Sequence, residues 1–183
     1  MASSEWYVPV GLNKCCSYVI LSIIVNMSKE ISEKDALLRL SALCAQGEHC
    51  QWEMLEKMRR WEVGEEAQAR IMQRLIKDRY VDDERYARAF VLDKIRYNKW
   101  GRRKVEQALW QKHIDEDIRQ QVLDDVSDEE YLNVLRPLLK QKRKTIKAQS
   151  DYELNQKLLR FAVGRGFTFD IIRQCLDVED DEW

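Results

Sequence analysis

Three nine-residue stretches decide the fold: VGEEAQARI at 63–71, IDEDIRQQV at 114–122 and FTFDIIRQC at 167–175. Each has an apolar residue at its first, fifth and ninth positions, a spacing that places side chains on one face of a helix. The first positions are 51 and then 53 residues apart. A period of this length is typical of helical repeat proteins, whose units bury their apolar faces against neighbours. The sequence therefore predicts an all-α protein, with three tandem three-helix repeats forming an elongated, curved stack.

The segments around these stretches repeat as well. Basic turns precede all three, and VDDERYA at 81–87 parallels VSDEEYL at 126–132. Asp82 or Asp83, and Ser127, are the expected N-caps, because acids follow them in the first helical turn. The nine expected helices have approximate spans 32–46, 50–61, 65–79, 83–99, 101–113, 115–125, 128–147, 151–164 and 168–178.

Two glycines and one proline mark breaks in this pattern. We expect Gly101 to open a helix and Gly166 to end one, so that both serve turn geometry. Pro137 falls inside the seventh expected helix and lacks a backbone donor. A kink or a restart of the helix is expected there.

The composition agrees with a helical protein and supplies no catalytic motif. Of 183 residues, 45% are hydrophobic and 34% charged, with only 6 glycines and 2 prolines to form turns. The five cysteines include no C-x-x-C pair, which favours reduced thiols in the cytoplasm over a disulfide framework or metal site. His49 and His113 are far apart in sequence, and no nucleotide-binding or hydrolase motif occurs. We expect a non-enzymatic protein without cofactors.

The first 26 residues differ from the rest of the chain. The apolar run CCSYVILSIIV at 15–25 is too short to span a bilayer, and one lysine precedes it. It is read either as a signal peptide or, as we favour, as an extension upstream of a natural start at Met27, which is disordered or mis-assigned. The expected domains are this extension at 1–26 and repeats at 27–80, 81–126 and 127–183, the last with an acidic tail.

Two runs of basic residues are the candidate binding sites on a chain of net charge −1. KIRYNKWGRRK at 94–104 interleaves cations with Tyr97 and Trp100, whereas KQKRKTIK at 140–147 has little apolar content. Such runs bind carboxylates or phosphates, or simply form a solvated helix face. The candidate partner-binding or DNA-binding residues are Lys94, Arg96, Lys99, Arg102, Arg103, Lys104, Lys140, Lys142, Arg143 and Lys144.

The stretch RYVDDERYARAFVLDKIRYNKWGRRKVEQAL at 79–109 resembles the central signature of the RecX family. The matching positions are Tyr80, Val81, Asp82, Asp83, Tyr86, Ala87, Phe90, Asp93, Arg96, Gly101, Arg102, Val105 and Leu109. The resemblance extends more loosely over 32–178 and weakens where Trp61 and Glu62 replace a basic-glycine turn. It implies a cytoplasmic, monomeric regulator of DNA repair and the SOS response. Such a protein binds the RecA filament on single-stranded DNA and restrains ATP hydrolysis and strand exchange.

Two other functions fit a helical stack with basic patches. A direct DNA-binding protein would use helix pairs such as 55–75 and 105–126. However, the recognition helix of the second pair, at 114–126, is acidic and would repel phosphates. A helical scaffold for some other protein is the remaining alternative.

Overall fold

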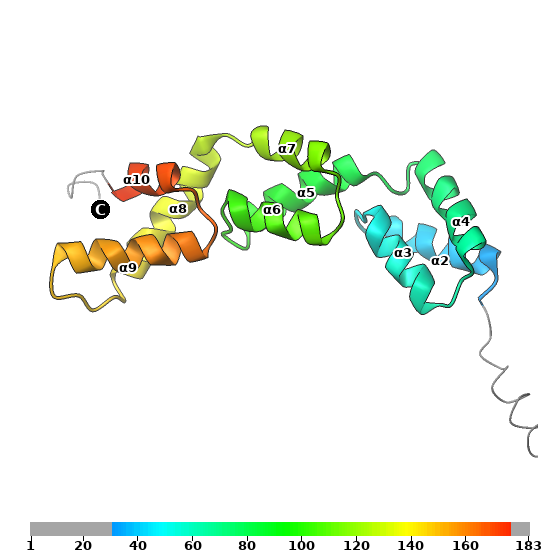
Figure 1. The fold of residues 1–183 in the computed structure, drawn as a ribbon, viewed down its shortest axis with the longest axis horizontal. Coiled ribbons are helices and arrows are strands. Elements are labelled where there is room, and N and C mark those ends of the chain that lie inside the picture. Colours follow the sequence, from blue (N-terminus) through cyan, green and yellow to red (C-terminus); the bar gives the residue numbers. More distant parts are fainter. Residues whose placement is uncertain (1–30, 177–183) are drawn as a thin grey trace, which may run out of the picture.

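The computed structural model describes residues 31–176, which form helices and no strand. The helices are α2 (Glu33–Cys44), α3 (Gln51–Arg60), α4 (Glu65–Lys77), α5 (Asp83–Arg96), α6 (Arg102–Gln111), α7 (Glu116–Asp124), α8 (Asp128–Arg143), α9 (Asp151–Gly164) and α10 (Phe169–Leu176). They form three successive units, α2–α4, α5–α7 and α8–α10, along the long axis of an arched molecule (Figure 1). The predicted all-α, three-unit fold is confirmed. The expected N-terminal extension and the acidic tail lie outside the described residues.

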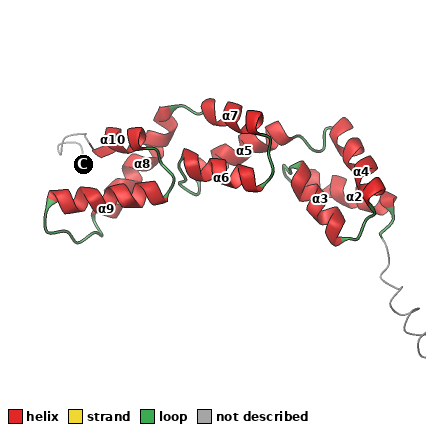
Figure 2. Cartoon of the chain, in the orientation of Figure 1, coloured by secondary structure: helices red, strands yellow, loops and turns green. Residues whose placement is uncertain are grey.

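The helices lie close to their expected spans. Figure 2 shows the described part of the chain as helices joined by loops and turns. Asp82 caps α5, since its carboxylate accepts a hydrogen bond from the backbone N–H of Arg85 at 3.0 Å. Ser127 is the N-cap of α8, although its side chain makes no capping bond. Of the two expectations at Pro137, a kink or a restart, the restart does not occur, because α8 runs through the proline as one helix. Among the described residues, no helix is both long and apolar enough to cross a membrane.

The same helix-ending turn joins the second and third helices of every unit and is the physical basis of the repeat. Glu62, His113 and Gly166 have positive φ angles of 57°, 55° and 87°. The residue after each is buried, and its N–H donates to a carbonyl five residues earlier. These bonds run from Val63 to Met58 (3.1 Å), from Ile114 to Leu109 (3.2 Å) and from Phe167 to Ala162 (3.2 Å). This is the Schellman motif, which satisfies the last helical carbonyls and anchors the chain with a hydrophobic contact.

The buried side chains form two cores. The first unit has its own core, which includes Leu40, Met58 and Ile71. The second and third units share one continuous core, which includes Val105 of α6 and Phe167 at the turn before α10. The second and third units therefore behave as one packed body, to which the first unit is attached.

Two glycines bring the backbones of the second and third units together. The N–H of Gly101 donates to the carbonyl of Arg165 at 2.9 Å, and the N–H of Arg103 donates to the carbonyl of Gly166 at 3.1 Å. A Cβ at Gly101 would lie 2.2 Å from the nitrogen of Phe167. Gly101 opens α6 and Gly166 ends its helix with a positive φ, both as expected, and both glycines also permit the close approach, since a Cβ at Gly166 would lie 2.6 Å from the nitrogen of Lys104.

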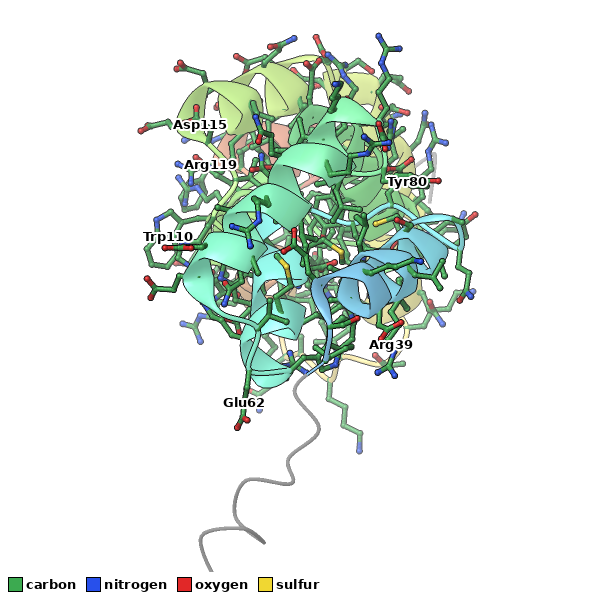
Figure 3. All side chains as sticks on the ribbon, turned by 90° about the vertical axis from the view of Figure 1, so that its right-hand side faces the viewer. Arg39, Glu62, Tyr80, Trp110, Asp115 and Arg119 are labelled. Carbon is green, nitrogen blue, oxygen red and sulfur yellow. The ribbon has the colours of Figure 1, made fainter. Side chains whose placement is uncertain are left out.

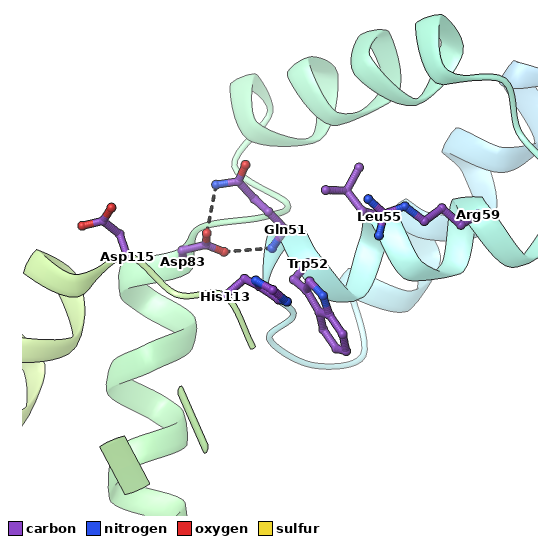
Figure 4. Close-up of a pocket in the computed structure, with 7 residues that line it drawn as sticks. All are labelled: Gln51, Trp52, Leu55, Arg59, Asp83, His113 and Asp115. Atoms are coloured by element: carbon purple, nitrogen blue, oxygen red, sulfur yellow. Dashed lines mark hydrogen bonds between the residues drawn. The ribbon is translucent and has the colours of Figure 1, made fainter. Parts of the chain in front are cut away.

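The junction between the first and second units is mostly polar. The backbone N–H and the side-chain amide of Gln51 donate to the two oxygens of Asp83, at 2.8 and 3.0 Å. Trp52 stacks on His113 with ring centroids 5.7 Å apart. A cavity of about 450 Å³ opens beside these groups (Figure 4). Its lining residues are Gln51, Trp52, Leu55, Arg59, Asp83, His113 and Asp115.

Candidate functional site

The first basic run lies at the turn between α5 and α6, where two of its lysines share one indole. The ammonium of Lys94 lies 6.0 Å from the centroid of Trp100, and that of Lys104 lies 4.7 Å from it. Lys94 also pairs with Asp93 at 3.1 Å. Cations held over a ring keep part of their hydration and can still meet an incoming anion.

Two arginines of this run are already engaged within the protein. The guanidinium of Arg96 pairs with Glu130 of α8 at 2.8 Å. Arg102 donates to the carbonyl of Leu123 at 2.9 Å and pairs with Asp124 at 2.5 Å. Both side chains therefore tie elements of the protein together. Lys99 occupies the turn itself, with φ 58°, and its ammonium donates to the carbonyl of Arg96.

The second basic run lies at the C-terminal end of α8. Lys140, Lys142 and Arg143 are in its last turn, and Lys144 is its C-cap. Positive charges at this end of a helix also interact favourably with the helix dipole. The ammonium of Lys142 lies 5.2 Å from the ring centroid of Phe161 on α9.

Arg165, which the sequence analysis did not single out, links the two runs. Its guanidinium lies 5.3 Å from the same Phe161 ring and donates to the carbonyl of Asn98 in the first run, at 3.1 Å. Runs that are some 40 residues apart in sequence thus meet across the junction of the second and third units. The missed signal was the repeat itself, since Arg165 follows Lys112 by the 53-residue offset.

We call this cluster the basic ridge and define it by four cations and two rings. Its members are Lys94, Lys104, Lys142, Arg165, Trp100 and Phe161. They come from α5, the following turn, α6, α8, α9 and the turn after α9. Such an arrangement holds positive charge at fixed spacing and suits a carboxylate or phosphate partner.

Titratable side chains gather around Glu53 at the junction between the first and second units, where they serve the structure. The Glu53 carboxylate accepts hydrogen bonds from Lys112 at 2.8 Å and Tyr86 at 3.2 Å, and meets His49 at 2.7 Å. Burial raises the pKa of Glu53, but the bonds from Lys112 and His49 outweigh it, so that the pKa falls below the ordinary 4.5. A carboxylate held ionised with its oxygens occupied is poorly suited to proton transfer. In the described part of the chain, no three metal-binding side chains gather.

Comparison with known families assigns these units. The sequence model of the second three-helix domain of RecX matches residues 82–123, and that of the third three-helix domain matches residues 128–176. The chain belongs to the RecX family. The two matched RecX domains are the second and third units described above, and together they contain the basic ridge.

Individual RecX proteins agree with this assignment. The regulatory protein RecX of Lactobacillus gasseri is 32% identical over 138 residues, which cover 72% of this chain and 49% of that protein. The regulatory protein RecX of Bacillus cytotoxicus is 27% identical over 130 residues, covering 71% and 48%. The chain thus spans about half the length of these relatives, which are named as regulators and not as enzymes.

A solved RecX structure shares the fold. The crystal structure of RecX from Lactobacillus salivarius superposes with a TM-score of 0.73 at 19% identity. The match covers 79% of this chain and 94% of that one. At this level of identity the likeness concerns the arrangement of helices.

Proposed function

We propose that this chain is a cytoplasmic regulator that binds the RecA filament on single-stranded DNA and inhibits its ATPase and strand-exchange activities, without being an enzyme itself. In this role it acts in DNA repair and the SOS response. The observation that carries the proposal is the basic ridge, built within the two domains that match RecX. RecA and its DNA present carboxylates and phosphates, the groups that such a ridge binds.

The ridge is supported as a binding surface by how its cations are held. Lys104 and Lys142 contact aromatic rings, and no acidic partner is seen for either among the described residues. The two units that carry them are fixed by the backbone bonds at Gly101 and Arg103. A surface whose cations already stand at fixed spacing loses less conformational entropy on binding than a flexible one.

The test is the rate of ATP hydrolysis by RecA on single-stranded DNA, titrated with the protein. The unchanged chain is expected to lower the rate. A Lys104→Gln/Lys142→Gln double variant should need roughly thirtyfold more protein for the same inhibition, since two lost contacts to anions of about 1 kcal/mol each add up to about 2 kcal/mol. Arg102 is left intact, because its bonds to Leu123 and Asp124 are structural.

A Lys34→Gln/Lys77→Gln variant provides the matched control. Both of these lysines are exposed in the first unit, so the change in net charge is the same while the ridge is untouched. The control should inhibit like the unchanged chain. Equal inhibition by both double variants would remove the role assigned to the ridge, and no effect of the unchanged chain would remove the proposed function.

Sequence-specific reading of duplex DNA is disfavoured as an alternative. The helix that would enter the major groove, α7, opens with Glu116 and Asp117 and ends with Asp124. Carboxylates on that helix repel the phosphates on either side of the groove. A gel shift that compares naked duplex with RecA-coated single strands distinguishes the two functions.

A further inference from the structure

One face of α6 combines exposed aromatic rings with guanidinium groups and forms a second surface, separate from the basic ridge. Arg103, Glu106, Gln107 and Trp110 follow one another at helical spacing and line a cavity of about 290 Å³ together with Arg119 of α7. Figure 3 shows Trp110 and Arg119 on the same side of the molecule, opposite Tyr80. We call these five residues, with the neighbouring Phe169, the α6 face.

The repeat shows that the fold does not require tryptophan at position 110. Its equivalents, 51 residues earlier and 53 residues later, are Arg59 and Val163. All three positions face solvent, with Trp110 64% exposed and Val163 37% exposed, and 59% of the Arg59 side chain accessible. A position that accepts arginine or valine in its sister units gains nothing in packing from an exposed indole. Large exposed aromatics of this kind mark interaction surfaces.

Phe169, at the other end of the α6 face, also indicates an interaction surface. Its equivalents in the first and second units are Glu65 and Glu116, acids in the first turn of a helix. The third unit keeps the second acid of this turn, at Asp170, but replaces the first with a phenylalanine that is 46% exposed. The guanidinium of Arg103 lies 5.9 Å from that ring. Both aromatic positions therefore depart from the repeat in a way that the fold does not explain.

The two arginines of the face offer donors to a partner. Among the described residues, neither Arg103 nor Arg119 pairs with a carboxylate. Arg119 donates one bond to the carbonyl of Ile114 at 3.3 Å, while its Nε is buried without an acceptor. Several other arginines of the described chain pair with acids, among them Arg88 and Arg96. The α6 face thus carries two guanidinium groups whose charge no carboxylate of the described residues pairs with.

We infer that the α6 face docks a protein surface that presents a carboxylate next to an apolar side chain. The carboxylate would meet Arg103 or Arg119, and the apolar group would cover Trp110. A nucleic-acid strand is the poorer fit, because Glu106 lines the cavity and Asp115 lies on the same side of the molecule. A phosphate backbone favours an unbroken positive track, whereas protein surfaces match mixed charge. The inference rests on the proposed function, in which the protein partner is the RecA filament.

The experiment measures binding of the full chain to RecA filaments on single-stranded DNA, and separately to single-stranded DNA alone. Trp110→Ser should weaken filament binding about tenfold or more, the size of effect seen for truncated interface tryptophans. Binding to naked DNA should not change. Tyr152→Ser is the matched control, because Tyr152 is an aromatic of the third unit that is 75% exposed. It should bind filaments like the unchanged chain, and circular dichroism should show that both variants keep their helices.

The possible outcomes distinguish failure of the inference from failure of the proposed function. Unweakened filament binding by Trp110→Ser would overturn the inference while leaving the proposed function in place. Equal weakening of filament and naked-DNA binding would also overturn it, because the face would then contact nucleic acid. Failure of the unchanged chain to bind filaments would overturn both the proposed function and the inference.

Discussion

Replacing Gly101 with alanine is expected to loosen the contact between the second and third units. The new Cβ would lie 2.2 Å from the nitrogen of Phe167 and 2.4 Å from the carbonyl carbon and oxygen of Gly166. These are backbone atoms, which cannot rotate away as the end of a side chain can. The helices on the two sides must therefore separate, or the turn around Gly166 must deform.

The expected loss of stability follows from two contributions. Overpacking of a tight contact typically costs about 1–3 kcal/mol. Separation also weakens the bonds from Gly101 to Arg165 and from Arg103 to Gly166, each with a net contribution of about 1 kcal/mol. The free energy of unfolding should thus fall by about 2–4 kcal/mol, after allowing for overlap between the two contributions.

Gly64→Ala isolates the effect of the clash. Gly64 and Gly101 are both N-caps without a side-chain capping bond, but a Cβ at Gly64 meets nothing within 4 Å. Alanine is a poorer N-cap than glycine, and that loss of well under 1 kcal/mol is common to both variants. The assays are urea unfolding followed by circular dichroism, and hydrogen exchange of the Arg103 amide. Equal losses in the two variants, or an unchanged exchange rate at Arg103, would refute this account of the junction.

Three further predictions concern other parts of the fold. Glu62→Gly should stabilise the first unit by about 1 kcal/mol in thermal unfolding, because glycine adopts φ 57° without a Cβ clash; a lower Tm would contradict this. Because the folded pKa of Glu53 lies below 4.5, its contribution to stability is complete above that pH and is lost as the pH falls through the folded pKa. Unfolding measured from about pH 7 to about pH 3 should therefore show a larger loss of stability toward acid in the unchanged chain than in Glu53→Gln. Cys50 and Cys175, whose pKa values burial raises to about 11, should be alkylated only after unfolding, and peptide mass spectrometry that finds them labelled in the folded protein would contradict this.

The three units could be predicted from the sequence because the repeat consists of positions at which the fold requires a particular type of residue. Val63, Ile114 and Phe167 must be apolar, since each anchors a helix-ending turn. The first unit has Trp61 and Glu62 in place of a basic-glycine turn, but this replacement does not alter the turn. Glu62 adopts the same positive φ as its equivalents, because the surrounding hydrogen bonds and the burial of Val63 determine it.

The candidate site was less predictable, because it depends on how the units pack. Arg96 and Arg102 belong to a basic run in sequence, yet the third unit supplies Glu130 to one, and α7 supplies Asp124 to the other. No local pattern specifies such pairs. Arg165 was overlooked for the opposite reason: it stands alone among apolar neighbours and becomes part of a basic surface only when its unit meets Asn98.

The junction between the first and second units and the junction between the second and third units have different residues at one equivalent position. This difference explains why only the second and third units share a continuous core. Gly101 and Cys50 are the N-caps of α6 and α3, 51 residues apart, and each faces a carbonyl of the following unit. At Gly101 the backbone N–H reaches the carbonyl of Arg165 at 2.9 Å. At Cys50 a side chain stands between the units, and its sulfur lies 4.0 Å from the carbonyl of Lys112. The thiol is buried in the core of the second unit but keeps the backbones apart, so polar side chains fill the remaining junction. The basic ridge and the α6 face both combine groups of the second and third units, and the shared core of these two units holds those groups at fixed spacing.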